Sequence, residues 1–79
     1  MKNGAFKLSE IEELFNVVDQ FEVEGIVYNL YSYWKTSFDG RGKLLVNITD
    51  GWYVYTRNYT ALYVLEHINE FKHFKLKVR

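Results

Sequence analysis

The chain has 79 residues, of which 48% are hydrophobic and 19% aromatic, with ten basic and ten acidic side chains and no cysteine. Because a domain of this length buries only about 60% of its unfolded surface, its stability must come from a dense aromatic core. The composition excludes disulfide bonds and thiolate metal sites, a membrane helix of roughly 20 apolar residues, and a strongly basic nucleic-acid binder. We expect one domain, residues 1–79, that makes no contact with a membrane.

The lack of cysteine and of a secretory signal segment favours a cytoplasmic protein. Residue types with A/T-rich codons, such as Phe, Tyr, Ile, Asn and Lys, are abundant, and proline is absent. This bias is typical of a low-GC bacterium or of its phages and mobile elements. It indicates a source and says nothing about mechanism.

The first predicted element is an amphipathic helix over residues 10–21, after a short extended segment at residues 5–8. Ser9 is the expected N-cap, and Glu12 completes a capping box. One buried stripe at helical spacing is formed by Ile11, Leu14, Phe15, Val18 and Phe21.

Charge is unevenly distributed along the chain. Residues 10–24 hold six acids and no base, whereas residues 72–79 hold four bases and no acid. We interpret both segments as solvated surfaces that complement helix dipoles. An acidic helix that imitates nucleic-acid phosphates is the alternative.

After a break at Gly25, residues 26–37 are predicted to form a strand, because aromatic and β-branched residues alternate there. Helical spacing is also present, but the aromatic density and the following turn favour a strand. A five-residue loop at residues 38–42 sets which face is buried. We expect Ile26, Tyr28, Leu30 and Trp34 in the core, and Val27, Asn29, Tyr31, Tyr33 and Lys35 on the outer face.

The strongest local signal is Asp50-Gly51, which lies between two runs of alternating apolar residues and predicts a hairpin with a two-residue type I′ turn. This register places Ile48 opposite Tyr53. The core face would carry Leu44, Val46, Ile48, Tyr53 and Tyr55, and the other face Leu45, Asn47, Thr49, Trp52, Val54 and Thr56.

A second helix is expected over residues 60–74, capped by Asn58 or Thr60, and residues 74–79 alternate in a way that suits a lysine-protected edge strand. The predicted fold is therefore a two-layer α+β domain. It has a three-stranded antiparallel meander, room for a fourth, C-terminal edge strand, and two helices on one face, in the order α-β-β-β-α(-β).

In this fold one face of the sheet has no cover, and it is the predicted binding surface. Aromatic and Arg side chains concentrate binding energy at interfaces. The residues assigned to partner binding are Tyr31, Tyr33, Lys35, Arg41, Trp52, Val54 and Arg57. The sequence thus predicts a small protein-binding module that docks on a larger protein, in its most concrete form a phage or mobile-element inhibitor of a host or defence enzyme.

Two alternatives use the same face. A single-stranded nucleic-acid binder would stack bases on the aromatic rings and hold phosphates with the basic side chains, but the zero net charge argues against it. A homodimer would hide the face against a second copy, and a homodimer built on an edge strand is also compatible with the sequence.

Catalysis is not expected. His67 and His73 do not match a zinc motif, and the glycines at positions 40 and 42 do not complete a phosphate-binding loop. We predict no catalytic residue, no metal and no cofactor.

Overall fold

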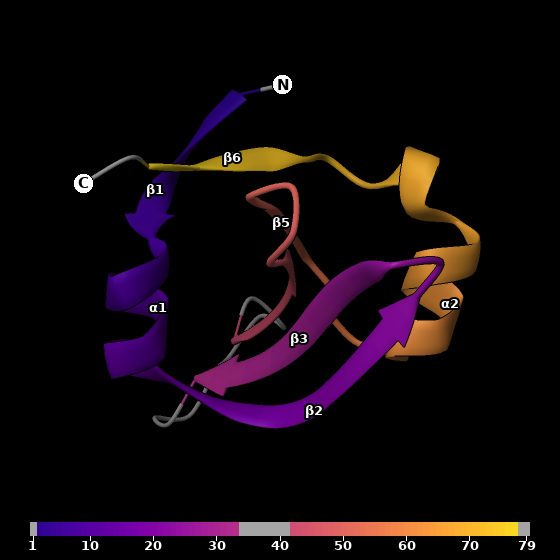
Figure 1. Ribbon diagram of the computed structural model, residues 1–79, viewed down its shortest axis with the longest axis horizontal. Coiled ribbons are helices and arrows are strands. Elements are labelled where there is room, and N and C mark those ends of the chain that lie inside the picture. The colour runs from indigo at the N-terminus through magenta and orange to yellow at the C-terminus, as the bar shows by residue number, and fades with distance from the viewer. Residues whose placement is uncertain (1, 34–41, 78–79) are drawn as a thin grey trace.

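The computed structural model describes residues 2–33 and 42–77, and side chains from residue 4 onward (Figure 1). Six strands form one sheet in the order β1-β6-β5-β4-β3-β2. The elements are β1 (Lys2–Lys7), α1 (Leu8–Leu14), β2 (Phe15–Val23), β3 (Ile26–Tyr33), β4 (Lys43–Asn47), β5 (Trp52–Tyr55), α2 (Ala61–Glu66), a 3₁₀ helix (Ile68–Glu70) and β6 (Phe74–Lys77).

The predicted three-stranded α+β meander is wrong. The sheet has six strands and is mixed, because β1 pairs in parallel with β6. The C-terminal strand lies between β5 and β1 and is not an edge. The two short helices do not share a face: in Figure 1, α1 stands on the left between β1 and β2, and α2 stands on the right.

The second half of the predicted helix over residues 10–21 is strand β2. Helix α1 begins at Leu8 and ends at Leu14, and its N-cap is Lys7, whose backbone N–H donates to Glu10 Oε1 at 2.8 Å. Ser9 is therefore inside the helix. The following residues include Val17 and Val18, whose β-branched side chains lower helix propensity, and pairing with β3 gives this segment backbone partners along one side.

The turn between β2 and β3 is the two-residue hairpin turn of this fold. Glu24 and Gly25 have φ values of 51° and 82° and join the paired residues Val23 and Ile26. Positive φ at both central residues is typical of a type I′ turn. A bulge at Val18 changes which side chains of β2 face each side of the sheet.

We expect Gly25→Ala to lower the free energy of unfolding by about 1–2 kcal/mol, because an L residue is strained at positive φ. A Cβ at this position meets nothing within 4 Å, so the change isolates the backbone effect. Glu24→Gly is the matched control, and it should leave stability equal or higher. Thermal denaturation measures both, and an unchanged Gly25→Ala variant would contradict the turn assignment.

The Asp50-Gly51 turn is longer than predicted. Asn47 pairs with Trp52, so four residues form the loop, and the Gly51 N–H donates to the Asn47 carbonyl at 2.9 Å. The Asn47 side chain accepts the Asp50 N–H at 2.7 Å. This side-chain bond stabilises the wider turn. The register between β4 and β5 therefore differs by two residues from the predicted one, since Val46 and not Ile48 lies opposite Tyr53. Because side chains alternate with a period of two, each side chain of β4 and β5 stays on its predicted face.

The face assignment of β3 is wrong. Tyr31 pairs with Leu44 and Leu30 with Leu45. Tyr31 therefore shares a face with Leu44, and Leu30 lies on the opposite face. Residues 38–42 were expected to make an odd-numbered loop, but an even number of residues separates the paired Ser32 and Lys43. A change of one residue in the length of this loop exchanges the two faces of β3. The predicted core residue Trp34 lies outside the described residues.

Both faces of the sheet are buried, each by its own core. The first core, beside α1 and β1, contains Ile11, Phe15, Tyr31, Leu44, Val46 and Tyr53. The second core, beneath α2, contains Tyr28, Leu45, Val54 and Val64, with Phe21, Ile26, Leu30, Trp52, Leu65, Ile68 and Phe71 packed against it. The predicted uncovered face is thus largely closed by α2 and the segment that follows.

Helix α2 is placed by its cap and its apolar stripe. Thr60 accepts the Tyr63 N–H at 3.1 Å, as an N-cap does. The buried Val64 then lies in the second core, with Leu65 and Ile68 beside it. The helix is much shorter than predicted, because it ends at Glu66 and the chain continues as a 3₁₀ turn.

Candidate functional site

The predicted site residues do not form one surface. Tyr31 is buried in the first core and Val54 in the second, so the sheet separates them. Trp52 is half-buried and its ring lies 4.5 Å from that of His73, centroid to centroid. Tyr33 is half-buried beside Phe15, Arg57 is exposed, and Lys35 and Arg41 lie outside the described residues.

An exposed edge strand is the first candidate surface. Strand β2 is at the end of the strand order, and among the described residues it pairs only with β3. Its apolar side chains Val17, Val18 and Val23 are 53%, 55% and 43% exposed. An apolar edge of this kind is a template for another strand, unless it is protected.

The pairing shows which backbone groups of β2 face outward. Val27 of β3 uses its backbone on the other side, where its N–H donates to Thr49 Oγ1 and its carbonyl accepts from Ile48 N–H, both at 2.9 Å. In an antiparallel ladder its partner Glu22 therefore directs its own N–H and carbonyl away from β3. The same alternation applies to Gln20, whose N–H is bonded to the Asp19 carboxylate at 2.9 Å.

The charge of this edge is negative. From Leu8 to Tyr33 the chain contains six acids and no Lys or Arg. Asp19, Glu22 and Glu24 are exposed along β2 and its turn, and the α1 side chains Glu12 and Glu13 are exposed beside it. Within residues 8–33, the charged side chains near a strand docked here are therefore all acidic.

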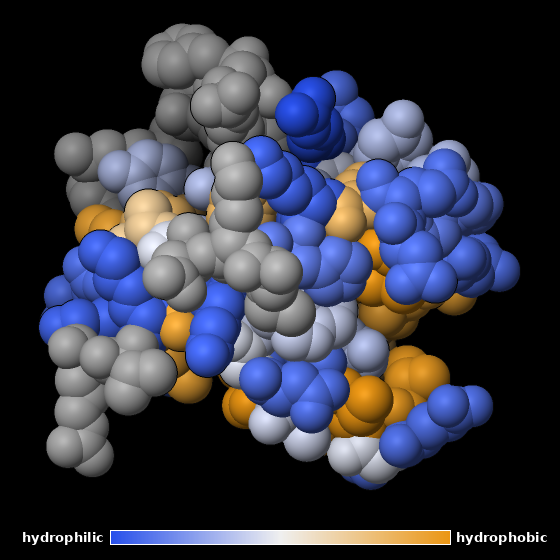
Figure 2. Space-filling model, turned by 90° about the horizontal axis from the view of Figure 1, so that it is seen from above, coloured by the Kyte–Doolittle hydropathy of each residue, from blue (hydrophilic) through white to orange (hydrophobic). Residues whose placement is uncertain are grey.

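A second exposed surface is the outer side of α2. The Tyr59 and Tyr63 rings stack with centroids 4.5 Å apart, and the His67 ring stacks on Tyr63 at 4.1 Å. Leu62 beside them is 67% exposed. Figure 2 shows hydrophobic surface between hydrophilic side chains on the side of the molecule that carries α2.

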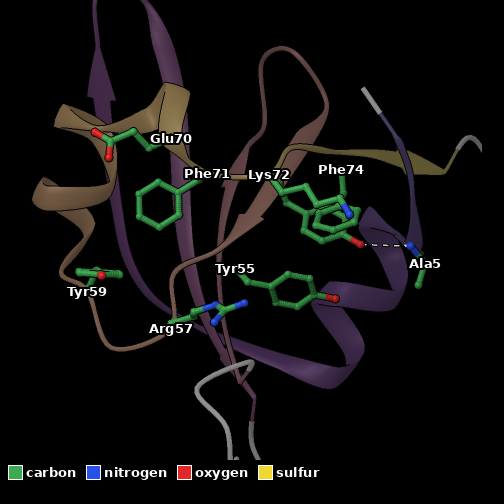
Figure 3. Close-up of a pocket in the computed structure, with 9 residues that line it drawn as sticks. Ala5, Tyr55, Arg57, Tyr59, Glu70, Phe71, Lys72 and Phe74 are labelled. Carbon is green, nitrogen blue, oxygen red and sulfur yellow. Dashed lines mark hydrogen bonds between the residues drawn. The ribbon is translucent and has the colours of Figure 1, made fainter.

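A pocket of about 780 Å³ lies between β5, the loop after it and the start of β6 (Figure 3). Its walls are mainly aromatic, and it also has two basic groups and one acidic group. The lining residues are Ala5, Tyr53, Tyr55, Arg57, Tyr59, Glu70, Phe71, Lys72 and Phe74.

Tyr53 lines the pocket, and its hydroxyl has a structural role. It accepts the Ala5 N–H at 3.1 Å and so ties β1 to β5. Burial raises the pKa of Tyr53 to about 12, against its ordinary value of 10.0, and the bond from Ala5 only partly opposes this. The group is neutral at physiological pH and acts as a hydrogen-bond partner.

Within residues 2–33 and 42–77, no group of three or more His, Asp or Glu side chains could hold a metal ion. In the same ranges no helix is long and apolar enough to cross a bilayer. Comparison with protein-family models, curated proteins and solved structures finds no match to this chain.

Sequence reasoning missed the β2 edge and the pocket for different reasons. Val17 and Val18 were assigned to a helix, although adjacent valines followed by Glu24-Gly25 are a signal for a strand and a turn. The pocket has no such signal, because its side chains come from β1, β5, the following loop and the approach to β6.

Proposed function

We propose that this protein is a non-catalytic protein-binding module, and that it captures an extended segment of a partner protein along the edge of β2. The observation that carries the proposal is a nine-residue edge strand with exposed valines. Addition of a strand to such an edge is a recurring mode of peptide recognition, in which backbone hydrogen bonds give affinity and side chains give specificity.

The outward backbone groups of β2 support this role. Glu22 offers an N–H and a carbonyl on the open side of the strand. The Gln20 N–H is already bonded to Asp19, so an incoming strand either leaves that bond in place or displaces the carboxylate. Pairing is therefore easiest at Glu22, between Gln20 and the turn.

Charge selects the partner. Glu22 lies on one face of β2 and Val23 on the other, so a segment in which Lys or Arg alternates with apolar residues can place its bases beside Glu22 and its apolar side chains beside Val23. Asp19 and Glu24 add to the negative charge near that segment. Nucleic acid is repelled by this edge. Two copies of this chain joined edge to edge would bring like charges together, which disfavours a homodimer of that kind.

The test uses two synthetic seven-residue peptides, one alternating Lys and Val and one alternating Glu and Val. Fluorescence anisotropy should show binding of the basic peptide only, with backbone amide shifts confined to β2 in a parallel NMR titration. Reversing two charges with Asp19→Lys and Glu22→Lys should weaken binding about tenfold, since each exposed ion pair contributes up to about 1 kcal/mol.

Glu66→Lys on the exposed side of α2 is the control, because it also replaces an exposed acid by a base but on a different element. It should leave the affinity within about twofold. Equal binding of both peptides, or shifts outside β2, would contradict strand addition. The role of a phage or mobile-element inhibitor stays a prediction, as does a cytoplasmic location, and identification of the native partner tests both.

A further inference from the structure

The pocket of Figure 3 is separate from the β2 edge and has the features of a small-molecule site. Its volume, about 780 Å³, is within the range of about 300–1,000 Å³ that ligand pockets occupy. Its rings come from different segments: Tyr55 from β5, Tyr59 from the loop before α2, Phe71 from the end of the 3₁₀ turn, and Phe74 from β6.

The rings of the pocket form two pairs. Figure 3 shows Phe71 and Tyr59 on one side of the pocket and Tyr55 and Phe74 on the other. Tyr59 and Phe71 meet edge to face, with centroids 5.7 Å apart, and Tyr55 and Phe74 do the same at 5.5 Å. Each pair fixes the orientation of its rings, because edge-to-face contacts are favourable and directional.

The charged groups of the pocket favour an anion. Arg57 and Lys72 supply two positive charges and Glu70 one negative charge. The Arg57 guanidinium lies between Tyr59 and Tyr55 in Figure 3, and the Lys72 ammonium lies 5.7 Å from the centre of the Phe74 ring. A guanidinium is suited to phosphate, which it binds with two parallel hydrogen bonds.

The backbone of Arg57 is unusual. Its φ is 55°, in the left-handed region, and within the described ranges Glu24 is the other non-glycine residue with positive φ. Glycine or Asn would hold this conformation at lower cost. The chain thus carries a long basic side chain at a position where a smaller residue fits the turn better, and this side chain lines the pocket.

We propose that this pocket binds a nucleoside monophosphate. The aromatic rings hold the base by stacking, and Arg57 binds the phosphate. Lys72, which lies beside Phe74, adds a second positive charge to the pocket. Base stacking on aromatic side chains is strong and tolerates different bases. The site is independent of strand addition at β2, because it uses no residue of that strand.

The proposal requires that the base and the phosphate of the ligand both contribute to its affinity. Calorimetric titration with AMP should show saturable binding, and adenosine and ribose 5-phosphate should each bind at least about tenfold more weakly, because each lacks one half of the recognised ligand. Ribose 5-phosphate binding as tightly as AMP would overturn the proposal, since the rings would then contribute nothing.

Arg57→Asn is the test variant, because Asn tolerates the left-handed backbone and the fold is retained. It should weaken AMP binding about tenfold, the expected effect of losing a charged hydrogen bond. Lys75→Gln is the matched control: Lys75 is exposed on β6 and does not line the pocket. It should change the affinity less than about twofold. An equal loss in both variants would overturn the proposal, because it would indicate non-specific attraction of an anion.

A free nucleotide and the end of a nucleic-acid strand share this chemistry. A single-stranded DNA hexamer with a 5′-phosphate is therefore titrated in parallel with AMP. Tighter binding of the hexamer that is lost in Arg57→Asn assigns the pocket to a strand end, and tighter binding of AMP assigns it to the free nucleotide. Failure of every probe would overturn the pocket proposal and leave the β2 proposal unaffected.

Discussion

Tyr53→Ala is expected to lower the free energy of unfolding by about 3–5 kcal/mol, the range measured for truncation of a buried aromatic residue. The Tyr53 side chain is 1% exposed. Its ring lies 5.4 Å from that of Phe74 and 6.0 Å from that of Phe6, centroid to centroid. The change leaves a cavity between β1, β5 and β6, and the Ala5 N–H loses its acceptor.

A small domain has little stability to lose, about 5–15 kcal/mol in total. Chemical denaturation of Tyr53→Ala should therefore show a transition at much lower urea concentration, or no folded baseline. The nearby Gly4 indicates how tightly the ring is held, since a Cβ on Gly4 would come within 2.5 Å of the Tyr53 hydroxyl oxygen. A variant that unfolds with the wild-type midpoint would contradict the placement of β1 over this ring.

Tyr53→Phe is the matched control, because it keeps the ring and removes only the hydroxyl. It should cost about 0.5–1.5 kcal/mol, the net contribution of one hydrogen bond. It should also change the alkaline profile. The pKa of Tyr53 is raised to about 12 in the folded state from 10.0, so this contribution to stability is complete below pH 10 and is lost as the pH rises toward 12. The Phe variant lacks that loss.

The central hairpin region was predictable because its signals are local. Strands β3, β4 and β5 are antiparallel neighbours, as the alternation in residues 26–58 indicates. The cap at Thr60 was also readable from the sequence. Both depend on residues within a few positions of one another, so no distant contact was needed to infer them.

The errors arose where distant contacts decide between two locally acceptable patterns. Phe15 and Phe21 fit the buried stripe of a helix. They equally fit a strand with a bulge at Val18, in which Phe15 points into the first core and Phe21 into the second. Helix propensity is a weak prior that tertiary pairing overrides. The sequence does not specify a bulge, so the strand could not be aligned in advance.

The error about the predicted binding face also arose because the local pattern allowed two arrangements. Exchange of the two faces of β3 depends on loop parity alone, and it moved Tyr31 from the predicted binding surface into the first core. The pocket was beyond prediction because Tyr55, Arg57 and Lys72 become neighbours only after β6 inserts between β5 and β1.

Leu45→Ala is expected to lower the free energy of unfolding by about 2–5 kcal/mol. Leu45 and its neighbour Leu44 are both 0% exposed, and they belong to the second and the first core respectively. Leu44→Ala is the companion variant. If the sheet had one solvated face, either Leu44→Ala or Leu45→Ala would lower the free energy of unfolding by less than about 0.5 kcal/mol, as surface substitutions do. Similar losses in both variants, measured by urea denaturation, are therefore the signature of a sheet covered on both sides.

The partner of Leu45 in the second core makes this prediction sharper. Val64 of α2 is buried in the same cluster as Leu45, whereas Leu44 lies across the sheet from it. In a double-mutant cycle, Leu45→Ala and Val64→Ala should show a coupling energy of about 0.5–3 kcal/mol, while Leu44→Ala and Val64→Ala should add within about 0.5 kcal/mol. Leu45→Val replaces the alanine variant where the double mutant is unfolded. A larger coupling for Leu44 than for Leu45 would mean that α2 covers the other face, and the two cores would have to be exchanged.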